Sequence, residues 1–314
     1  MKKLLSLVFS FVLLFALAAC GSSSSGGEGD GSDSGITIGV TMNNLSTEFS
    51  ANLAKGVEDA AKERGVEVIV NDGQGDPSKQ NQQVDTFIAQ EVDAIIIQPL
   101  DTEASSPAIE KAKEAGIPII NINSVTTAEP DAFVGSRDEE SAELAIDFIA
   151  EQIGGKGNIV MMHGRAGQSA EIKRTNGAVE QLKKHPEMSI IAEQTADWDR
   201  EKGLTLMQNW LQAHKGKINA VFAQNDEMGL GALKAVEEAG LQDDIIVVSV
   251  DAIADALQAV NDERLNATVF QNAIGQGEGS IDTALKIING EDYEKEVFIP
   301  FELVTKDNIE NYLN

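Results

Sequence analysis

Polar side chains gather where one apolar run of the sequence ends, in the block Gln-Asn-Asp-Glu at 224–227. The block separates an apolar segment at 220–223 from an Ala-, Leu-, Glu- and Lys-rich segment that is typical of a helix. Asn225 or Asp226 can cap that helix by accepting hydrogen bonds from its free backbone amides. One cap accounts for one polar residue and not for four, so we expect the block to contribute to a binding site as well.

The same kind of position recurs after four other predicted strands. Carboxylates and amides there can bind vicinal hydroxyls, and an aromatic ring can pack against the C–H bonds of a sugar-like ring. Each residue taken alone also fits a cap or a turn, and a packed core position is the alternative for the tryptophan. Together they predict a site for a polyhydroxylated ligand, formed by Asn123, Trp198, Asp251 and Gln271 with the block at 224–227.

Strands and helices alternate from residue 36 onward. Continuous Val- and Ile-rich strands separated by helices indicate parallel sheets covered on both faces. There are too many strands for one compact sheet, so we predict two doubly wound α/β domains, with ligand bound outside the carboxyl ends of their strands. Strands are expected at 36–41, 66–70, 94–97, 117–122, 132–135, 157–162, 189–195, 219–223, 245–250, 266–270 and 297–304. Helices are expected at about 49–64, 78–90, 103–115, 138–152, 169–184, 200–213, 226–239, 253–261 and 275–289.

The first 35 residues do not fit this alternation. Basic residues precede an apolar run, and Leu-Ala-Ala-Cys at 17–20 supplies small residues before a cleavage point, which is typical of an export signal over 1–19. The alternative, a membrane anchor, is disfavoured because the run is short. Cys20 is the only cysteine, so the chain can form no internal disulfide. The Gly- and Ser-rich stretch at 21–35 cannot bury a core and is predicted to be a flexible tether.

Composition and charge exclude several kinds of function. The chain has 314 residues and a formal net charge of −27, which repels nucleic-acid phosphates and anionic lipid headgroups. The three histidines, His163, His185 and His214, stand on separate segments without metal-ligand spacing, and the chain has no Gly-x-Ser-x-Gly motif. We therefore expect no catalytic residues, no metal, no cofactor and no nucleic-acid partner.

Several segments together resemble the ribose- and galactose-binding type of bacterial ABC-transporter solute-binding protein, which has the type I periplasmic-binding-protein fold. The resemblance covers nearly the whole chain after residue 35 and rests on AVFAQNDEMGLGALKAVEEAG, DDIIVVSVDA, AGIPIININ, GQSAEIKRTNG, TADWDREKGLTLMQNWL and AVNDERLNATVFQ. It implies two lobes joined by a three-strand hinge, with crossovers near 135–137, 271–272 and 301–302. The first lobe would comprise 36–136 plus 272–301, and the second 137–271 plus 302–314.

The resemblance also implies ligand contacts from the second lobe. Arg174 matches an arginine that forks onto sugar oxygens, although a surface helix cation is the alternative. Trp198 matches an aromatic residue that faces the ring. Asn225 matches an amide that binds hydroxyls, Asp251 an acid that accepts two of them, and Gln271 an amide at the edge of the hinge.

In the first lobe the match is less regular. Phe49 matches one of two adjacent ring-stacking aromatics, and Ser50 stands at the position of the other. Asn44 lies in a loop that is longer than in the ribose pattern. Asn123 and Ser124 replace the Asp-Arg pair of ribose binders, which removes two charged contacts and argues against ribose itself.

Two further departures concern charged residues. Glu48 stands where the family usually has proline. Arg137 could supply a substitute cation from the hinge, and a solvated residue at a helix start is the alternative. A hexose, a pentose or an inositol is the expected class of ligand.

Three classes of function remain from the sequence. The first is a binding protein that delivers a sugar or cyclic polyol to an ABC permease. The second is a lipid-anchored sensor that presents its ligand to a membrane receptor kinase, and the third is a secreted α/β enzyme, which we do not favour. The ending Leu-Ala-Ala-Cys resembles the lipobox of bacterial lipoproteins, which implies that Cys20 is lipidated and holds a monomer at the outer face of the cell membrane or in the periplasm.

Overall fold

Apolar runs of the sequence form the strands of two six-stranded sheets in the computed structural model, which describes residues 35–313. The first sheet has the order β11-β5-β4-β3-β1-β2, and all its pairings are parallel. Its four central strands, β5, β4, β3 and β1, are buried under helices on both faces, as continuous Val and Ile runs predict. They are β1 (Thr37–Met42), β2 (Glu67–Asp72), β3 (Ala94–Ile97), β4 (Ile119–Ile122), β5 (Ala132–Gly135) and β11 (Glu296–Phe298).

The second sheet has the order β12-β10-β9-β8-β6-β7 and repeats the same plan. Its pairings are parallel except that of β12 with β10, which is antiparallel. Its strands are β6 (Lys156–His163), β7 (Glu187–Thr195), β8 (Ala220–Ala223), β9 (Ile246–Asp251), β10 (Ala267–Phe270) and β12 (Glu302–Val304).

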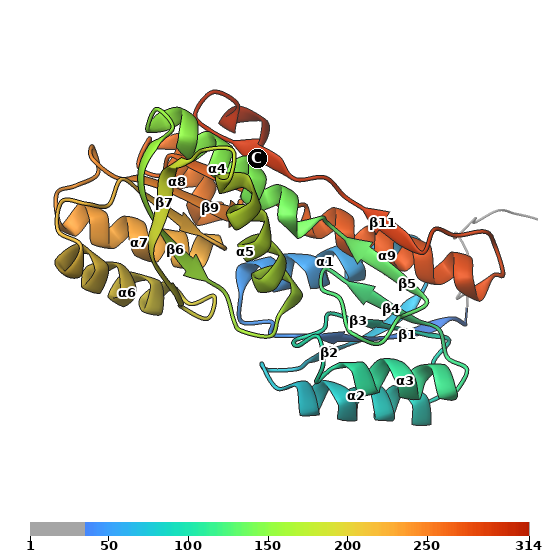
Figure 1. Ribbon diagram of the computed structural model, residues 1–314. Coiled ribbons are helices and arrows are strands. Elements are labelled where there is room, and N and C mark those ends of the chain that lie inside the picture. The colour runs from blue at the N-terminus through green and yellow to red at the C-terminus, as the bar shows by residue number, and fades with distance from the viewer. Residues whose placement is uncertain (1–34, 314) are drawn as a thin grey trace, which may run out of the picture. The chain divides into compact units, whose positions relative to one another are not determined.

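Helices cover both faces of each sheet and define two lobes (Figure 1). In the first lobe, α1 (Glu48–Glu63) and α9 (Ala273–Ile288) pack on one face, and α2 (Pro77–Ala89) and α3 (Ser106–Glu114) on the other. In the second lobe, α4 (Asp138–Gln152) and α5 (Ser169–Leu182) oppose the group formed by α6 (Arg200–Ala213), α7 (Asp226–Glu238) and α8 (Ala254–Asn261). These two doubly wound α/β lobes confirm the predicted fold class.

Local chemistry sets the ends of the helices. Side chains of Thr47, Asp76 and Asp199 accept backbone hydrogen bonds at the starts of α1, α2 and α6. Gly65 and Gly116 follow α1 and α3 with φ of 66° and 76°, in the left-handed region that favours glycine. The predicted helices therefore begin and end close to where the sequence places them.

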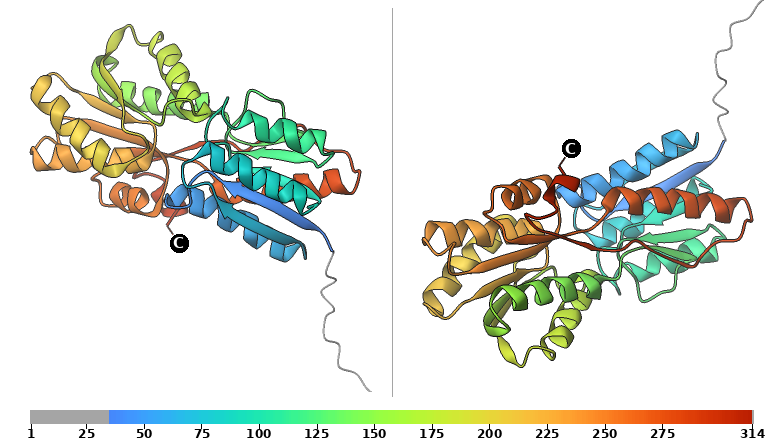
Figure 2. Two further views of the ribbon diagram at one scale, coloured as in Figure 1. Left: turned by 90° about the horizontal axis from the view of Figure 1, so that it is seen from below. Right: turned by 90° about the horizontal axis from the view of Figure 1, so that it is seen from above.

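The chain passes between the two sheets three times, after β5, after β10 and between β11 and β12 (Figure 2). The prediction of one strand at 297–304 is wrong, because that segment forms two short strands in different sheets. Pro300 lies between them and has no backbone N–H for a strand ladder. The final residues form a short 3-10 helix, Ile309–Asn311.

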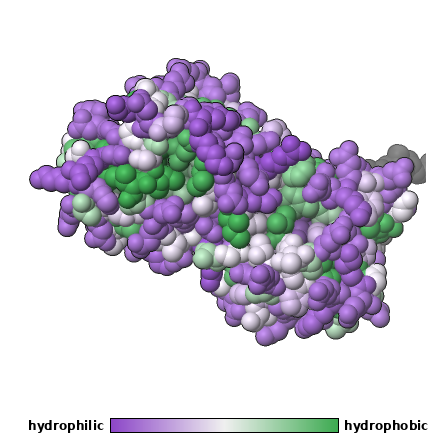
Figure 3. All heavy atoms as spheres, in the orientation of Figure 1, coloured by the Kyte–Doolittle hydropathy of each residue, from purple (hydrophilic) through white to green (hydrophobic). Residues whose placement is uncertain are grey.

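Several predictions concern residues outside the described part of the chain. They are the export signal at 1–19, Cys20 as a lipidation site and most of the tether at 21–35. Within residues 35–313, no helix has both the length and the apolar character needed to cross a bilayer. The face of the molecule in Figure 3 is predominantly hydrophilic, with apolar atoms gathered in a few places.

Candidate ligand-binding cleft

A cavity of about 200 Å³ lies between residues of the two lobes. Pockets for drug-sized ligands measure roughly 300–1,000 Å³, so this cavity suits a smaller, single-ring solute. All eight ligand contacts predicted from the sequence line it, although they lie as far as 227 positions apart in the chain. They are Asn44, Phe49, Asn123, Arg174, Trp198, Asn225, Asp251 and Gln271.

The doubly wound topology explains this convergence. In a parallel sheet the carboxyl ends of all strands meet at one edge, and the residues that follow them line a common crevice. Asn123 follows β4, Asn225 follows β8, Asp251 ends β9 and Gln271 follows β10. The rule that found these residues in the sequence therefore holds in both sheets.

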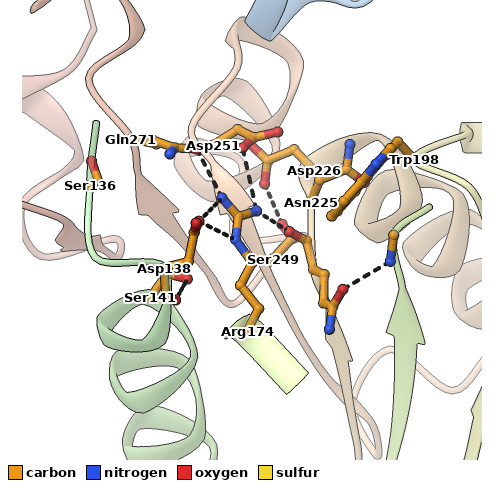
Figure 4. A network of polar contacts seen from close by, with 12 residues as sticks. Ser136, Asp138, Ser141, Arg174, Trp198, Asn225, Asp226, Ser249, Asp251 and Gln271 are labelled. Carbon is orange, nitrogen blue, oxygen red and sulfur yellow. Dashed lines mark hydrogen bonds and ion pairs between the residues drawn. The ribbon is translucent and has the colours of Figure 1, made fainter. Parts of the chain in front are cut away.

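Arg174 is the centre of a buried polar network that links α5 to three other elements (Figure 4). Its Nε and Nη2 donate to Oδ1 of Asp138 at 3.2 and 3.1 Å, and Nη2 also donates to Oε1 of Gln271 at 3.0 Å. Its Nη1 donates to the backbone carbonyl of Gln224. A guanidinium has five N–H donors, so these bonds leave one N–H of Nη1 for other acceptors. The side chain is 3% exposed, which rules out the surface-cation alternative.

Asp251 faces the cavity from the end of β9. Its Oδ1 lies 3.9 Å from Nη1 of Arg174, beyond hydrogen-bonding distance. The backbone φ is 126° at Asp251 and 59° at Ala252, so the loop turns sharply as the strand ends. Burial raises the pKa of Asp251 well above its usual range, and the positive charge of Arg174 opposes that rise.

Asp226, the first residue of α7, holds this loop in place. Its Oδ1 accepts hydrogen bonds from the hydroxyls of Ser249 and Thr268, and its Oδ2 accepts from the backbone N–H of Ile253 at 2.9 Å. Burial raises the pKa of Asp226 to about 7, although the two hydroxyl hydrogen bonds favour its charged form. Its role is therefore to position the loop that carries Asp251.

Asp138, the first residue of α4, is the main counter-ion of Arg174. Burial raises its pKa, and the charge and hydrogen bonds of Arg174 oppose the rise. Two buried carboxylates, those of Asp138 and Asp251, thus share one buried guanidinium.

Within the described residues, no set of three or more His, Cys, Asp or Glu side chains could hold a metal ion.

Trp198 fits both interpretations that the sequence left open. The indole packs against the core of the second lobe and also lines the cavity. Its Nε1 donates to Oε1 of Gln168, which fixes the plane of the ring. Gly164 lies beneath the ring, where a Cβ atom would overlap it. The tryptophan is therefore held in place from two sides with part of its surface on the cavity.

The first lobe supplies an aromatic ring and several amides. Phe49 is partly buried against the core of that lobe. Asn123 has a φ of 66°, and its Nδ2 donates to Oε1 of Gln276 on α9 at 3.1 Å. Gln98, which follows β3, donates weakly to Oδ1 of Asn123 at 3.5 Å and accepts from the backbone N–H of Asn43 at 3.2 Å. These amides order one another around the cavity.

Asn225 caps α7 by accepting from the backbone N–H of Met228 at 3.1 Å, and it also lines the cavity. Arg137 is placed away from the cavity, so it is not a substitute cation there. Its guanidinium lies 4.6 Å from the centre of the Phe298 ring and 3.9 Å from Glu140 on α4, and its side chain is 60% exposed. The alternative of a solvated residue at a helix start is correct.

Sequence reasoning missed several polar residues that line the cavity, among them Gln98, Arg165, Gln168, Asp197 and Asp199. Gln98 follows the predicted strand at 94–97 directly, so the rule applied to the other strand ends would have found it. Arg165 and Gln168 lie in the loop between β6 and α5, and no local pattern distinguishes them from other loop residues.

Among residues 35–313, three hydrogen bonds join the lobes away from the strands that connect them. The backbone N–H of Thr102 donates to the carbonyl of Gly167 at 3.0 Å. The backbone N–H of Val125 donates to Oγ of Ser169 at 3.1 Å. The backbone N–H of Ala254, at the start of α8, donates to Oε1 of Glu48 at 2.9 Å. These bonds hold the lobes together around the cavity.

Comparisons with known proteins agree with this arrangement. A family model described as a periplasmic binding protein domain matches residues 38–292. The ribose import binding protein of Bacillus subtilis is 36% identical over 315 residues, which cover 98% of this chain and 100% of that protein. The xylitol-binding protein of Mycolicibacterium smegmatis is 34% identical over 295 residues, covering 94% of this chain and 83% of that protein.

A solved structure has the same fold over most of the chain. It is an ABC transporter solute binding protein from Bacillus halodurans with bound myo-inositol. It aligns with a TM-score of 0.85 and 39% sequence identity, and the alignment covers 90% of this chain and 98% of that chain.

Proposed function

The chain belongs to the periplasmic binding protein family, and we propose that it captures a sugar or cyclic polyol and delivers it to an ABC permease. The observation that carries the proposal is the cavity, which the amides, the carboxylate and the aromatic rings of both lobes enclose. Relatives named for ribose, xylitol and bound myo-inositol support the ligand class. Those relatives are binding proteins and not enzymes, which agrees with the expectation of no catalysis.

Capture requires the lobes to open and close. The three bonds between the lobes form when the cavity is closed, so ligand enters after they break and is held when they form again. Domain closure about a few connecting segments is a common way of trapping a ligand. In the closed cavity, Asp251 and Arg174 would bind ligand oxygens while Trp198 and Phe49 pack against the ring.

A thermal-shift and calorimetry screen of residues 36–314 tests this function. The probes are D-ribose, xylitol, myo-inositol and a set of hexoses. A probe at about 100 times its dissociation constant should add about 2.7 kcal/mol to the free energy of unfolding. Failure of every sugar and polyol to bind, or unchanged binding in both Asp251→Ala and Asn225→Ala, would refute the proposal.

We propose further that Cys20 becomes the lipidated N-terminus of a monomer at the outer face of the membrane. The apolar run, the small residues before Cys20 and the Gly- and Ser-rich stretch after it support this. A diacylglyceryl group plus a second acyl chain would anchor the protein stably, whereas one chain binds only marginally. Mass spectrometry of the exported protein should find lipid on Cys20, and an unmodified cysteine or cleavage elsewhere would contradict the proposal.

A further inference from the structure

Gln276 is a buried glutamine on α9 that lies outside the cavity. Its side chain is fully buried, and burying an amide is costly unless hydrogen bonds compensate. Its Oε1 accepts from Nδ2 of Asn123 at 3.1 Å, and its Nε2 donates to Oγ of Ser136 at 3.0 Å. Among residues 35–313 the side chain makes no other hydrogen bond. It therefore joins a residue of the cavity to the connecting segment that follows β5.

The orientation of these amides is fixed from the far side of the cavity. Oε1 of Gln98 accepts from the backbone N–H of Asn43 at 3.2 Å. A backbone N–H only donates, so the NH2 group of Gln98 must point the other way, toward Oγ of Ser50 at 3.3 Å and Oδ1 of Asn123 at 3.5 Å. Asn123 thus turns its oxygen toward Gln98 and its NH2 group toward Gln276.

The two ends of this row of amides are held unequally. Gln98 is held firmly, because Nε2 of Gln80 on α2 donates to its backbone carbonyl at 2.8 Å. Asn123 is held weakly on its oxygen side, where the donors Gln98 and Ser124 lie at 3.5 and 3.4 Å. The 3.1 Å bond to Gln276 is the shortest side-chain hydrogen bond of Asn123 within the described residues. Without it, the amide of Asn123 would be free to rotate.

We propose that Gln276 is a positioning residue for ligand binding, which holds the amide of Asn123 in its binding orientation without touching the ligand. This inference rests on the proposed function and adds a residue to it. A side chain that is already ordered loses less rotamer freedom when ligand binds, so it contributes more to affinity. The bond to Ser136 in turn holds the amide of Gln276.

A double-mutant cycle on ligand affinity tests the inference by calorimetry. The probe is the one among D-ribose, xylitol, myo-inositol and the hexoses that binds the wild type most tightly. Gln276→Met keeps the length of the side chain and removes its polar atoms, and it should raise Kd about fivefold to tenfold. Asn123→Gly removes the amide and accepts the φ of 66° at this position. In that background Gln276→Met should change Kd by less than about twofold, because the group it positions is gone.

The matched control is Ser280→Ala. Ser280 is also buried on α9, one turn beyond Gln276, but its Oγ donates within the helix to the carbonyl of Gly277 at 2.7 Å. This variant should bind the probe like the wild type. Thermal unfolding without ligand measures the stability of each variant separately. If Gln276→Met does not fold, Ser136→Ala replaces it in the cycle. It removes the acceptor that holds Gln276, so Kd should rise about twofold to threefold in the wild-type background and stay constant in Asn123→Gly.

Several outcomes overturn the inference. It fails if Gln276→Met binds like the wild type, if its loss is equally large in the Asn123→Gly background, or if Ser280→Ala loses as much. It also fails if Asn123→Gly binds no probe, because the loss of one amide contact does not abolish binding. In all these cases probe binding by the wild type leaves the proposed function standing, whereas absence of any sugar or polyol binding overturns both.

Discussion

Replacing Arg174 by methionine should destabilise the second lobe by about 3–5 kcal/mol. The side chains of Arg174 and Asp138 are each 3% exposed, and removing one partner of a buried pair leaves an unpaired buried charge. Arg174→Met also removes the donor to Oε1 of Gln271 and the donor to the carbonyl of Gln224. Urea unfolding followed by circular dichroism measures the change in the free energy of unfolding.

The matched control is Arg200→Met. Arg200 also binds two carboxylates, Glu227 at 2.6 Å and Asp255 at 2.8 Å, but its side chain is 42% exposed. Solvent-exposed ion pairs contribute about 0–1 kcal/mol, so this variant should lose little stability. Equal losses in the two variants would show that the buried charge of Asp138 is not the cause.

A double-mutant cycle isolates that charge. In Arg174→Met combined with Asp138→Leu, no charge of the pair remains buried, so the double variant should lose about 1–3 kcal/mol less than the sum of the single losses. Additive losses would refute the reasoning.

The pH dependence gives a second check on the same pair. Without Arg174, the folded-state pKa of Asp138 rises further above its unfolded value of about 4, because burial then acts unopposed. Between these two pKa values the native state binds more protons than the unfolded state, so stability falls as pH rises. The deficit of Arg174→Met relative to wild type should therefore be smaller at pH 5 than at pH 8, and an equal deficit would contradict this account.

Three other predictions follow from single contacts. Burial raises the pKa of Asp226 to about 7, so this group lowers the free energy of unfolding as pH rises from about 4 to 7, by at most on the order of 4 kcal/mol. In Asp226→Asn, the free energy of unfolding should decline less between pH 5 and pH 8 than in the wild type. An unchanged decline would contradict the assignment. Glu48→Ala removes the hydrogen bond to the backbone N–H of Ala254, so ligand release should be about fivefold faster in stopped-flow measurements, with an unchanged association rate. An unchanged release rate would show that this bond does not hold the cleft closed. Gly231→Ala should lower the free energy of unfolding by about 1–3 kcal/mol in thermal unfolding, because a Cβ there overlaps α6. Gly279→Ala, whose nearest neighbour would be a side-chain methyl at 3.1 Å, should cost less. The reverse order would exclude close helix packing as the reason.

The fold was predictable because periodicity and local chemistry agree along the chain. Strands at 94–97 and 132–135 have the predicted bounds, and Gly65 and Gly116 end helices as expected. The segment at 297–304 shows what such patterns miss. Its apolar residues fit a strand on either side of Pro300, and its division between two sheets depends on which strand edge is available in each lobe.

The candidate site was predictable to the extent that it follows strand ends. Asn123, Trp198, Asn225, Asp251 and Gln271 were found in this way, and the resemblance to a known family added Arg174, Phe49 and Asn44. Sequence patterns could not show which acceptors bind the N–H groups of the Arg174 guanidinium, because these acceptors come from α4, the end of β8 and the end of β10. They also could not show that Asp251 lacks a close cation, since that depends on distances between separate elements.

The block at 224–227 shows why binding and folding are coupled in this cleft. Gln224 holds the backbone N–H of Gly164 at 2.9 Å and accepts from Arg174, while Asn225 caps α7 and lines the cavity. Asp226 fixes the loop of Asp251, and Glu227 pairs with Arg200 at the rim. One turn of the chain thus positions the loops after β6 and β9 and the start of α7. A substitution in this block changes stability and site geometry together, so reduced binding there does not identify a ligand contact. A substitution at Asp251 separates loss of stability from loss of a ligand contact better. Its carboxylate faces the cavity and accepts no hydrogen bond from another side chain among residues 35–313.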